Sequence, residues 1–148
     1  QYDLDKYAAG DAKALNIAVV REVGLYSPNE GWTGVTPAFA DRAREEIPRQ
    51  IAAALKEGPV DYWAFYPEEL LPERASDMAY LAEMTRLIRS LDPGKAPIFM
   101  YEPNHRKTGE LMRTARELDV VSMGAYAQWS EFRDRSAWVG LQTARMLR

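Results

Sequence analysis

The chain has 148 residues, of which 47% are hydrophobic and 28% are charged, and its formal net charge is -3. These proportions are typical of one folded domain with a substantial core, and they exclude a disordered or fibrous protein. The small negative charge gives no electrostatic reason to expect nucleic acid or an anionic membrane surface as a partner.

Residue content excludes several further classes of protein and site. No apolar run approaches the roughly 20 residues that span a bilayer, and residues 1–11 lack the regions of a signal peptide, so we expect a soluble chain. The chain has no cysteine and one histidine, His105, which removes disulfides, thiolate sites and multi-histidine metal sites. We therefore expect no cofactor. The chain begins at Gln1 rather than at a methionine, which indicates processing or a longer parent polypeptide.

Short apolar runs alternate with helical patterns along the chain. These runs are rich in β-branched and aromatic residues, as in strands that are buried on both faces of a parallel sheet. The predicted strands are Leu15–Val20, Val60–Tyr66, Ala96–Tyr101 and Val120–Tyr126. The predicted helices cover residues 3–13, 37–57 and 76–90, a segment that begins at Thr108, and residues 136–147.

Two of these helices carry clear signals. Thr36 is a suitable N-cap, and Pro37 suits the first helical position, where no N–H is needed. Apolar residues then recur every four positions from Phe39 to Leu55, and Pro48 within that stripe predicts a kink or a division of the helix. In the next helix we expect an inward face formed by Met78, Leu81, Ala82, Thr85 and Ile88.

The alternation of helices and strands, without a hairpin, predicts parallel strands joined by right-handed crossovers in one unit over residues 1–148. An open doubly wound sheet and a (β/α)8 barrel both fit this order. No strand is followed by a glycine-rich phosphate loop, which favours half of a TIM barrel. Half a barrel has two uncovered strand edges, so the remainder of the barrel or another chain is the expected partner.

Acids and aromatic residues follow each predicted strand. Because the carboxyl ends of parallel strands meet at one edge, these residues are expected to converge on one rim. The candidates are Arg21, Glu22, Glu68, Glu69, Tyr101, Glu102, Tyr126 and Trp129, together with Trp32 in the loop over residues 25–36. Carboxyl groups can protonate a glycosidic oxygen, and flat rings can pack against sugar faces. The rim therefore predicts a carbohydrate substrate.

Four segments resemble barrel glycoside hydrolases of the large retaining clan, especially the β-galactosidase-like members. The segment YDLDKYAAGDAKALNIAVVREVGLYSPNEGW is similar to the part from their second helix through their third strand, and VDYWAFYPEE is similar to their fourth strand. IRSLDPGKAPIFMYEP resembles the passage into the fifth strand, and LDVVSMGAYAQW resembles the sixth. The resemblance implies strands three to six of a (β/α)8 barrel, hydrolysis of glycosidic bonds, and an extracellular or periplasmic location.

The same resemblance implies roles for particular acids. In those families the fourth strand ends in the acid/base glutamate, usually preceded by asparagine. Pro67 stands in that place here, so Glu68 and Glu69 are rival candidates for the general acid/base. Partial burial beside other carboxylates would raise the pKa of such an acid towards neutrality. The family's nucleophile follows the seventh strand, so the second carboxylate is expected from outside residues 1–148, and the chain alone is expected to be inactive.

Other interpretations fit the same residues. Glu68 and Glu69 could be solvated acids that start a helix, and the aromatic residues could close a core. A non-catalytic carbohydrate-binding barrel protein would keep the aromatic rim without a working acid pair, and Pro67 favours it. A free-standing doubly wound domain would instead be an open sheet with a crevice where the strand order reverses.

Overall fold

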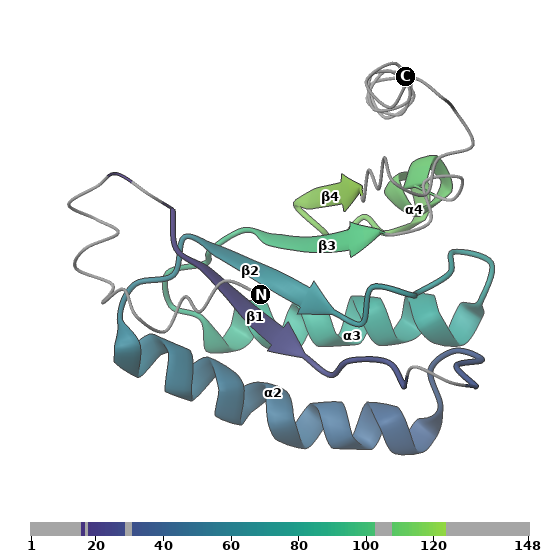
Figure 1. Cartoon of the computed structure of the whole chain (residues 1–148), viewed down its shortest axis with the longest axis horizontal. Coiled ribbons are helices and arrows are strands. Elements are labelled where there is room, and N and C mark those ends of the chain that lie inside the picture. Colours follow the sequence, from purple (N-terminus) through teal and green to yellow (C-terminus); the bar gives the residue numbers. More distant parts are fainter. Residues whose placement is uncertain (1–15, 17, 29–30, 103–107, 124–148) are drawn as a thin grey trace, which may run out of the picture.

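The structure is a computed structural model, and it describes residues 16, 18–28, 31–102 and 108–123. Within these residues four strands alternate with three helices (Figure 1). The strands are β1 (Val20–Gly24), β2 (Tyr62–Tyr66), β3 (Ile98–Glu102) and β4 (Val120–Met123). The helices are α2 (Pro37–Glu57), α3 (Ala75–Leu91) and α4 (Thr108–Thr114).

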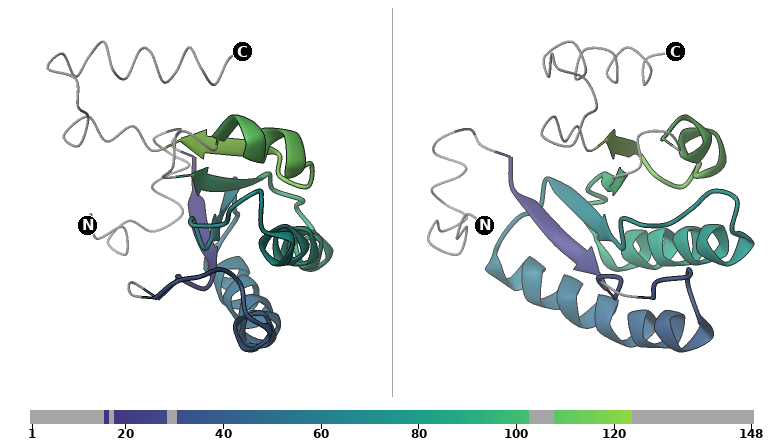
Figure 2. Two further views of the ribbon diagram at one scale, coloured as in Figure 1. Left: turned by 90° about the vertical axis from the view of Figure 1, so that its right-hand side faces the viewer. Right: turned by 45° about the vertical axis from the view of Figure 1, so that its right-hand side comes forward.

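The four described strands form one parallel sheet in the order β1-β2-β3-β4. This confirms the predicted α/β class with parallel strands. The three described helices lie on the same side of the sheet (Figure 2). Consecutive strands are neighbours, so the described part of the sheet has no reversal of strand order. The sheet is open, with β1 and β4 at its edges, and closure into a barrel is not seen among the described strands.

The core lies between the sheet and helices α2 and α3. In β2 the side chains alternate, so Trp63 and Phe65 are fully buried against the helices whereas Tyr62 is 38% exposed on the other face. The other large buried side chains of this core are Ile47 and Ile51 of α2, Leu81, Met84 and Ile88 of α3, and Ile98 and Met100 of β3. The interior is therefore built from the helix-facing side of the sheet.

Helix α2 begins as the sequence predicts, because the Thr36 hydroxyl accepts a hydrogen bond of 3.2 Å from the backbone N–H of Phe39. The sequence predicts a kink or a division at Pro48, and the division is wrong, since α2 continues through this residue as one element. A proline inside a helix costs about 3 kcal/mol. The burial of Ala43, Ile47 and Ile51 on both sides of Pro48 offsets this cost and keeps the helix in one piece.

Strand β1 lies further along the chain than the sequence predicts. Leu15–Val20 was the expected strand, but the strand runs from Val20 to Gly24 and pairs residue by residue with β2. The Gln50 side chain fixes its end, because it accepts from the N–H of Gly24 at 2.8 Å and donates to the Gly24 carbonyl at 3.0 Å. The position of β1 is therefore set by pairing with β2 and by the contact with Gln50 of α2. Both partners are distant from β1 in the sequence.

Three of the five residues predicted to face inward from α3 are buried, namely Leu81, Thr85 and Ile88, whereas Met78 and Ala82 are only half-buried. The helix also buries Asp77, Tyr80 and Met84, so its inward face is turned towards these residues. The remaining strands were predicted to within a few residues, with β3 at Ile98–Glu102 rather than Ala96–Tyr101. An ion pair between Arg44 and Glu83 joins α2 to α3 at the surface, with a shortest distance of 2.6 Å.

Some predicted elements lie outside the described residues. These are the helices over residues 3–13 and 136–147 and the end of the last strand beyond Met123. The site candidates Tyr126 and Trp129 also lie there. No helix in the described part of the chain is long and apolar enough to cross a membrane.

Candidate functional site

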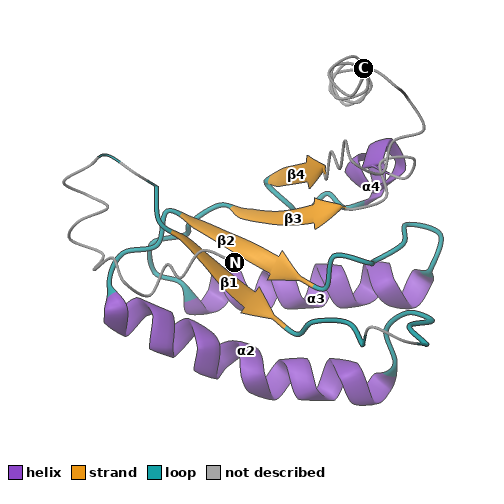
Figure 3. Cartoon of the chain, in the orientation of Figure 1, coloured by secondary structure: helices purple, strands orange, loops and turns teal. Residues whose placement is uncertain are grey.

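The ends of β1 and β2 lie against each other, and the loops that follow them leave the sheet at the same end (Figure 3). Gly24 is paired with Tyr66, and a Cβ atom on Gly24 would lie 2.3 Å from the Tyr66 carbonyl oxygen. Gly24 also has a φ of +110°, which side-chain-bearing residues rarely adopt. We name residues 25–36 the β1 loop and residues 67–74 the β2 loop.

The β2 loop presents the two candidate acids. It begins at Pro67, which is buried and follows a cis peptide bond, and it is anchored by Leu70, which is fully buried. Between these two anchors, Glu68 and Glu69 are half-buried. Both carboxylates are therefore held by a backbone that is fixed at each side.

Glu69 joins the β2 loop to the β1 loop. Its carboxylate accepts a short hydrogen bond from the Ser27 hydroxyl. Its backbone carbonyl accepts a 3.3 Å hydrogen bond from the indole N–H of Trp32, whose ring packs edge-on against Phe39 at 5.1 Å. The Glu69 side chain is thus occupied in holding the two loops together.

Glu68 has different surroundings. No hydrogen bond joins its carboxylate to another residue whose side chain is described. Partial burial raises the pKa of the Glu68 carboxyl, and the negative charge of Glu69 raises it further. The environment of Glu68 therefore favours the protonated form of its carboxyl.

Two tyrosines and a third acid form a cluster at the same end of the sheet. The Tyr26 hydroxyl donates a 2.5 Å hydrogen bond to Glu22, and the ring centroids of Tyr26 and Tyr66 are 4.4 Å apart. Burial raises the pKa of Tyr66, and the charges of Glu22 and Glu68 add to this shift. Tyr66 therefore interacts electrostatically with Glu22 on β1 and with Glu68 in the β2 loop.

A buried carboxylate, Asp77, supports both loops from the first turn of α3. It is fully buried and accepts hydrogen bonds from the backbone N–H groups of Val35 at 2.8 Å and Leu71 at 3.0 Å. The Arg74 guanidinium lies 3.6 Å from the same carboxylate. Gly34 packs so closely that an added Cβ atom would lie 2.9 Å from an Asp77 oxygen.

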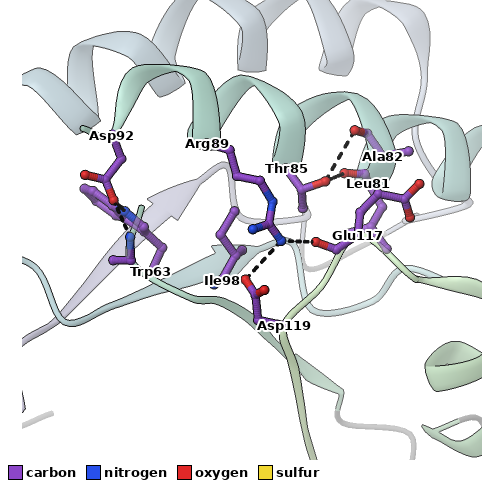
Figure 4. Close-up of polar contacts among 10 residues, drawn as sticks. Trp63, Leu81, Ala82, Thr85, Arg89, Asp92, Ile98, Glu117 and Asp119 are labelled. Carbon is purple, nitrogen blue, oxygen red and sulfur yellow. Dashed lines mark hydrogen bonds and ion pairs between the residues drawn. The ribbon is translucent and has the colours of Figure 1, made fainter. Parts of the chain in front are cut away.

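Another buried carboxylate lies at the opposite end of the sheet. Asp92 accepts a 2.9 Å hydrogen bond from the Trp63 indole (Figure 4). It also accepts hydrogen bonds from the backbone N–H groups of Ala96 and Gly94, each at 2.8 Å. Burial alone would raise the pKa of Asp92, but these hydrogen bonds outweigh burial and hold the pKa below its ordinary value. This carboxylate joins α3 to the starts of β2 and β3.

The structure brings four of the predicted site residues together, namely Glu22, Trp32, Glu68 and Glu69. Arg21 is not among them, because it lies on the helix-facing side of β1 and forms a 2.9 Å ion pair with Glu57 of α2. The backbone of Tyr101 and Glu102 is placed at the end of β3, opposite Ser122 and Met123, but their side chains are not described. Tyr126 and Trp129 lie outside the described residues.

Two residues of this region were not predicted. Tyr26 stands in a loop of mixed composition, and its spacing of four residues from Glu22 was the only local signal. Asp77 was overlooked because an acid does not belong to an apolar helical stripe. Its two backbone partners are distant in sequence, so no local pattern reveals them.

The described residues contain no group of three acidic, histidine or cysteine side chains that could hold a metal ion. Comparisons with protein-family models, with curated proteins and with solved structures found no match. The likeness to glycoside hydrolases therefore rests on the sequence patterns described above.

Proposed function

We propose that the edge of the sheet formed by the ends of β1 and β2 hydrolyses O-glycosidic bonds of a carbohydrate, with Glu68 as the general acid/base. The observation that carries this proposal is the half-buried Glu68 carboxyl at the end of β2, whose pKa is raised by burial and by Glu69. A raised pKa is what a carboxylic acid needs in order to hold a proton near neutral pH.

The chemistry follows from the leaving group. A glycosidic oxygen leaves as a poor alkoxide unless it is protonated as the bond to the anomeric carbon breaks. Glu68 would give its proton to that oxygen and, as a carboxylate, would then take a proton from the attacking water. Glu69 would keep the pKa of Glu68 high while its own carboxylate stays fixed by Ser27.

The proposed enzyme is a barrel, of which the described sheet is one half. Four parallel strands in chain order, with their helices on one side, have the winding of a (β/α)8 barrel. The sequence resemblance to strands three to six supports the same arrangement. In this proposal further strands pair with the free edges of β1 and β4, and the second carboxylate comes from one of them.

The test compares Glu68→Gln with Glu69→Gln in the full-length protein, using lactose, cellobiose and xylobiose as substrates. Glu68→Gln should reduce turnover by about 10²- to 10⁴-fold, because it removes the transferable proton. Glu69→Gln should retain activity. As the pH is raised, however, its activity should begin to fall at a lower pH than that of the wild type, because removal of the neighbouring charge lowers the pKa of Glu68. Full activity in both variants would reject the role of Glu68.

A carbohydrate-binding protein without turnover is the second candidate. Pro67 favours it, because this residue occupies the place of the asparagine that precedes the acid/base in the resembling families. In that case calorimetry on the full-length protein would detect binding of one of the three disaccharides, and prolonged incubation would release no monosaccharide.

A further inference from the structure

We propose that Tyr26 is a stacking platform for a sugar ring and that the carboxylates of Glu22 and Glu69, at the same end of the sheet, restrict the ligand to sugars without negative charge. The identity of the ligand class rests on the proposed function. The platform itself rests on the placement of Tyr26, which neither the strand pattern nor the resemblance assigns to the site.

Tyr26 is exposed and yet held in a defined orientation. Its side chain is 64% exposed although it makes two specific contacts. Its hydroxyl donates to Glu22 at 2.5 Å, and its ring lies against Tyr66 with a centroid distance of 4.4 Å and an interplanar angle of 43°. Most of the ring therefore remains open to a ligand, and little conformational freedom is left to lose on binding.

The platform lies at the same edge of the sheet as the proposed acid. Tyr66 contacts the Tyr26 ring, and the charge of Glu68 acts on the Tyr66 hydroxyl. A sugar whose apolar C–H face packs on Tyr26 would therefore lie beside Glu68. Glu22, already fixed by Tyr26, can accept a hydrogen bond from a sugar hydroxyl with its remaining lone pairs.

Charge determines which sugars fit. Glu22 of β1 and Glu69 of the β2 loop lie at the same end of the sheet, and no ion pair between described residues neutralises either carboxylate. Arg21 and Arg74 pair with Glu57 and Asp77 instead. A uronic acid or a sugar phosphate would bring a further negative charge into this region and be repelled. A neutral hexose or pentose carries no such charge and would not be repelled.

The experiment measures binding by calorimetry in the full-length protein that carries Glu68→Gln, so that the ligand is not turned over. The neutral probes are lactose, cellobiose and xylobiose, and the anionic probe is digalacturonic acid. Adding Tyr26→Ala should weaken binding of the neutral sugar by about three- to tenfold, as expected for the loss of one aromatic contact. Tyr26→Phe keeps the ring and should weaken binding less.

Tyr62→Ala is the matched control, because Tyr62 is also an exposed tyrosine but begins β2 at the other end of the sheet. It should leave binding unchanged. Equal binding by Tyr26→Ala and the parent, failure of all three neutral sugars to bind, or equally tight binding of digalacturonic acid would overturn the proposal. Binding that depends on Tyr26, in a protein that hydrolyses nothing when Glu68 is present, would reject the catalytic proposal and support the platform.

Discussion

Gly24 brings the ends of β1 and β2 closer together than a residue with a side chain could. Its φ is +110°, and a Cβ atom would lie 2.3 Å from the carbonyl oxygen of Tyr66. Contacts under 3 Å with backbone atoms cannot be relieved by a side-chain rotation. The strand pair must therefore separate if this residue changes, and the proposed site would separate with it.

Gly24→Ala should lower the free energy of unfolding by more than about 2 kcal/mol, since it combines backbone strain with overpacking. Gly31→Ala is the control at a second positive φ, of +71°, where an added Cβ atom has nothing within 4 Å. It should cost only about 1 kcal/mol. Urea unfolding of both variants measures the difference, and equal losses would show that the approach to Tyr66 is unimportant.

The sequence predicts part of the site at this scale. Glu22, Glu68 and Glu69 were expected on one edge because strand ends of a parallel sheet share an edge, which needs only the order of the elements. The structure places all three at the end of the sheet shared by β1 and β2. Arg21 was placed on the same edge because β1 was expected to end before it. Once β1 runs to Gly24, alternation puts Arg21 on the helix side. The hydrophobic pattern around β1 does not reveal its register, because the register is set by pairing with β2, which is distant in the sequence.

At the scale of the elements, Asp77 joins the loops after β1 and β2 through the start of α3. Asp77→Ala would leave the part-buried backbone N–H groups of Val35 and Leu71 without their acceptor. Each unsatisfied group costs about 1–3 kcal/mol, so we expect a loss of about 2–5 kcal/mol in the free energy of unfolding. The amides of Val35 and Leu71 should also exchange with solvent much faster.

Asp41→Ala is the control for this prediction. Asp41 is an exposed acid of α2 that pairs with Arg44 on the surface, and its loss should cost less than about 1 kcal/mol. A comparable effect of Asp41→Ala and Asp77→Ala on stability would contradict the role assigned to Asp77.

Asp92 makes the contact between α3 and the starts of β2 and β3 dependent on pH. Its pKa is depressed in the folded state, so its stabilising contribution is complete above its ordinary pKa of about 3.9 and is lost as the pH falls through the depressed value. Asp92→Asn should therefore unfold at a lower temperature than the wild type at pH 7, and this difference should narrow at pH 3. A constant difference at both pH values would show that the charge of Asp92 does not contribute.

The elements themselves were largely predictable. Alternating apolar runs and helical stripes are local signals, and they were sufficient for the parallel α/β class and for the N-terminus of α2. The inward face of α3 was predicted in part: Leu81, Thr85 and Ile88 are buried as expected. The burial of Asp77 was not predicted, because it depends on N–H donors from two distant loops. The continuity of α2 at Pro48 likewise depends on the burial of Ala43, Ile47 and Ile51, whose stabilising effect cannot be estimated from the sequence pattern alone.

At the scale of the molecule, β1 and β4 are the edges of the described sheet. The exposed apolar residues Val20 on β1 and Val120 on β4 lie on these edge strands, at 43% and 46% exposure. Exposed edges are a liability that native proteins pair or cover. The proposed barrel would pair them with further strands.

Hydrogen exchange on the full-length protein tests this closure. In a barrel, the amides of β1 and β4 that do not bond to β2 and β3 should be protected to a similar degree as those of β2, since each finds a partner on the next strand. Fast exchange of those amides on both edge strands, with slow exchange in β2 and β3, would contradict the barrel and leave an open sheet.

The most direct measurement of the role of Glu68 uses two substrates that differ in their need for a proton. Full-length wild type and Glu68→Gln are compared on a disaccharide and on the 4-nitrophenyl glycoside of the same sugar. Loss of the acid should reduce hydrolysis of the disaccharide by about 10²- to 10⁴-fold. The nitrophenyl glycoside should lose much less, because nitrophenolate leaves without protonation. Equal losses on both substrates, or no loss on either, would contradict Glu68 as the general acid.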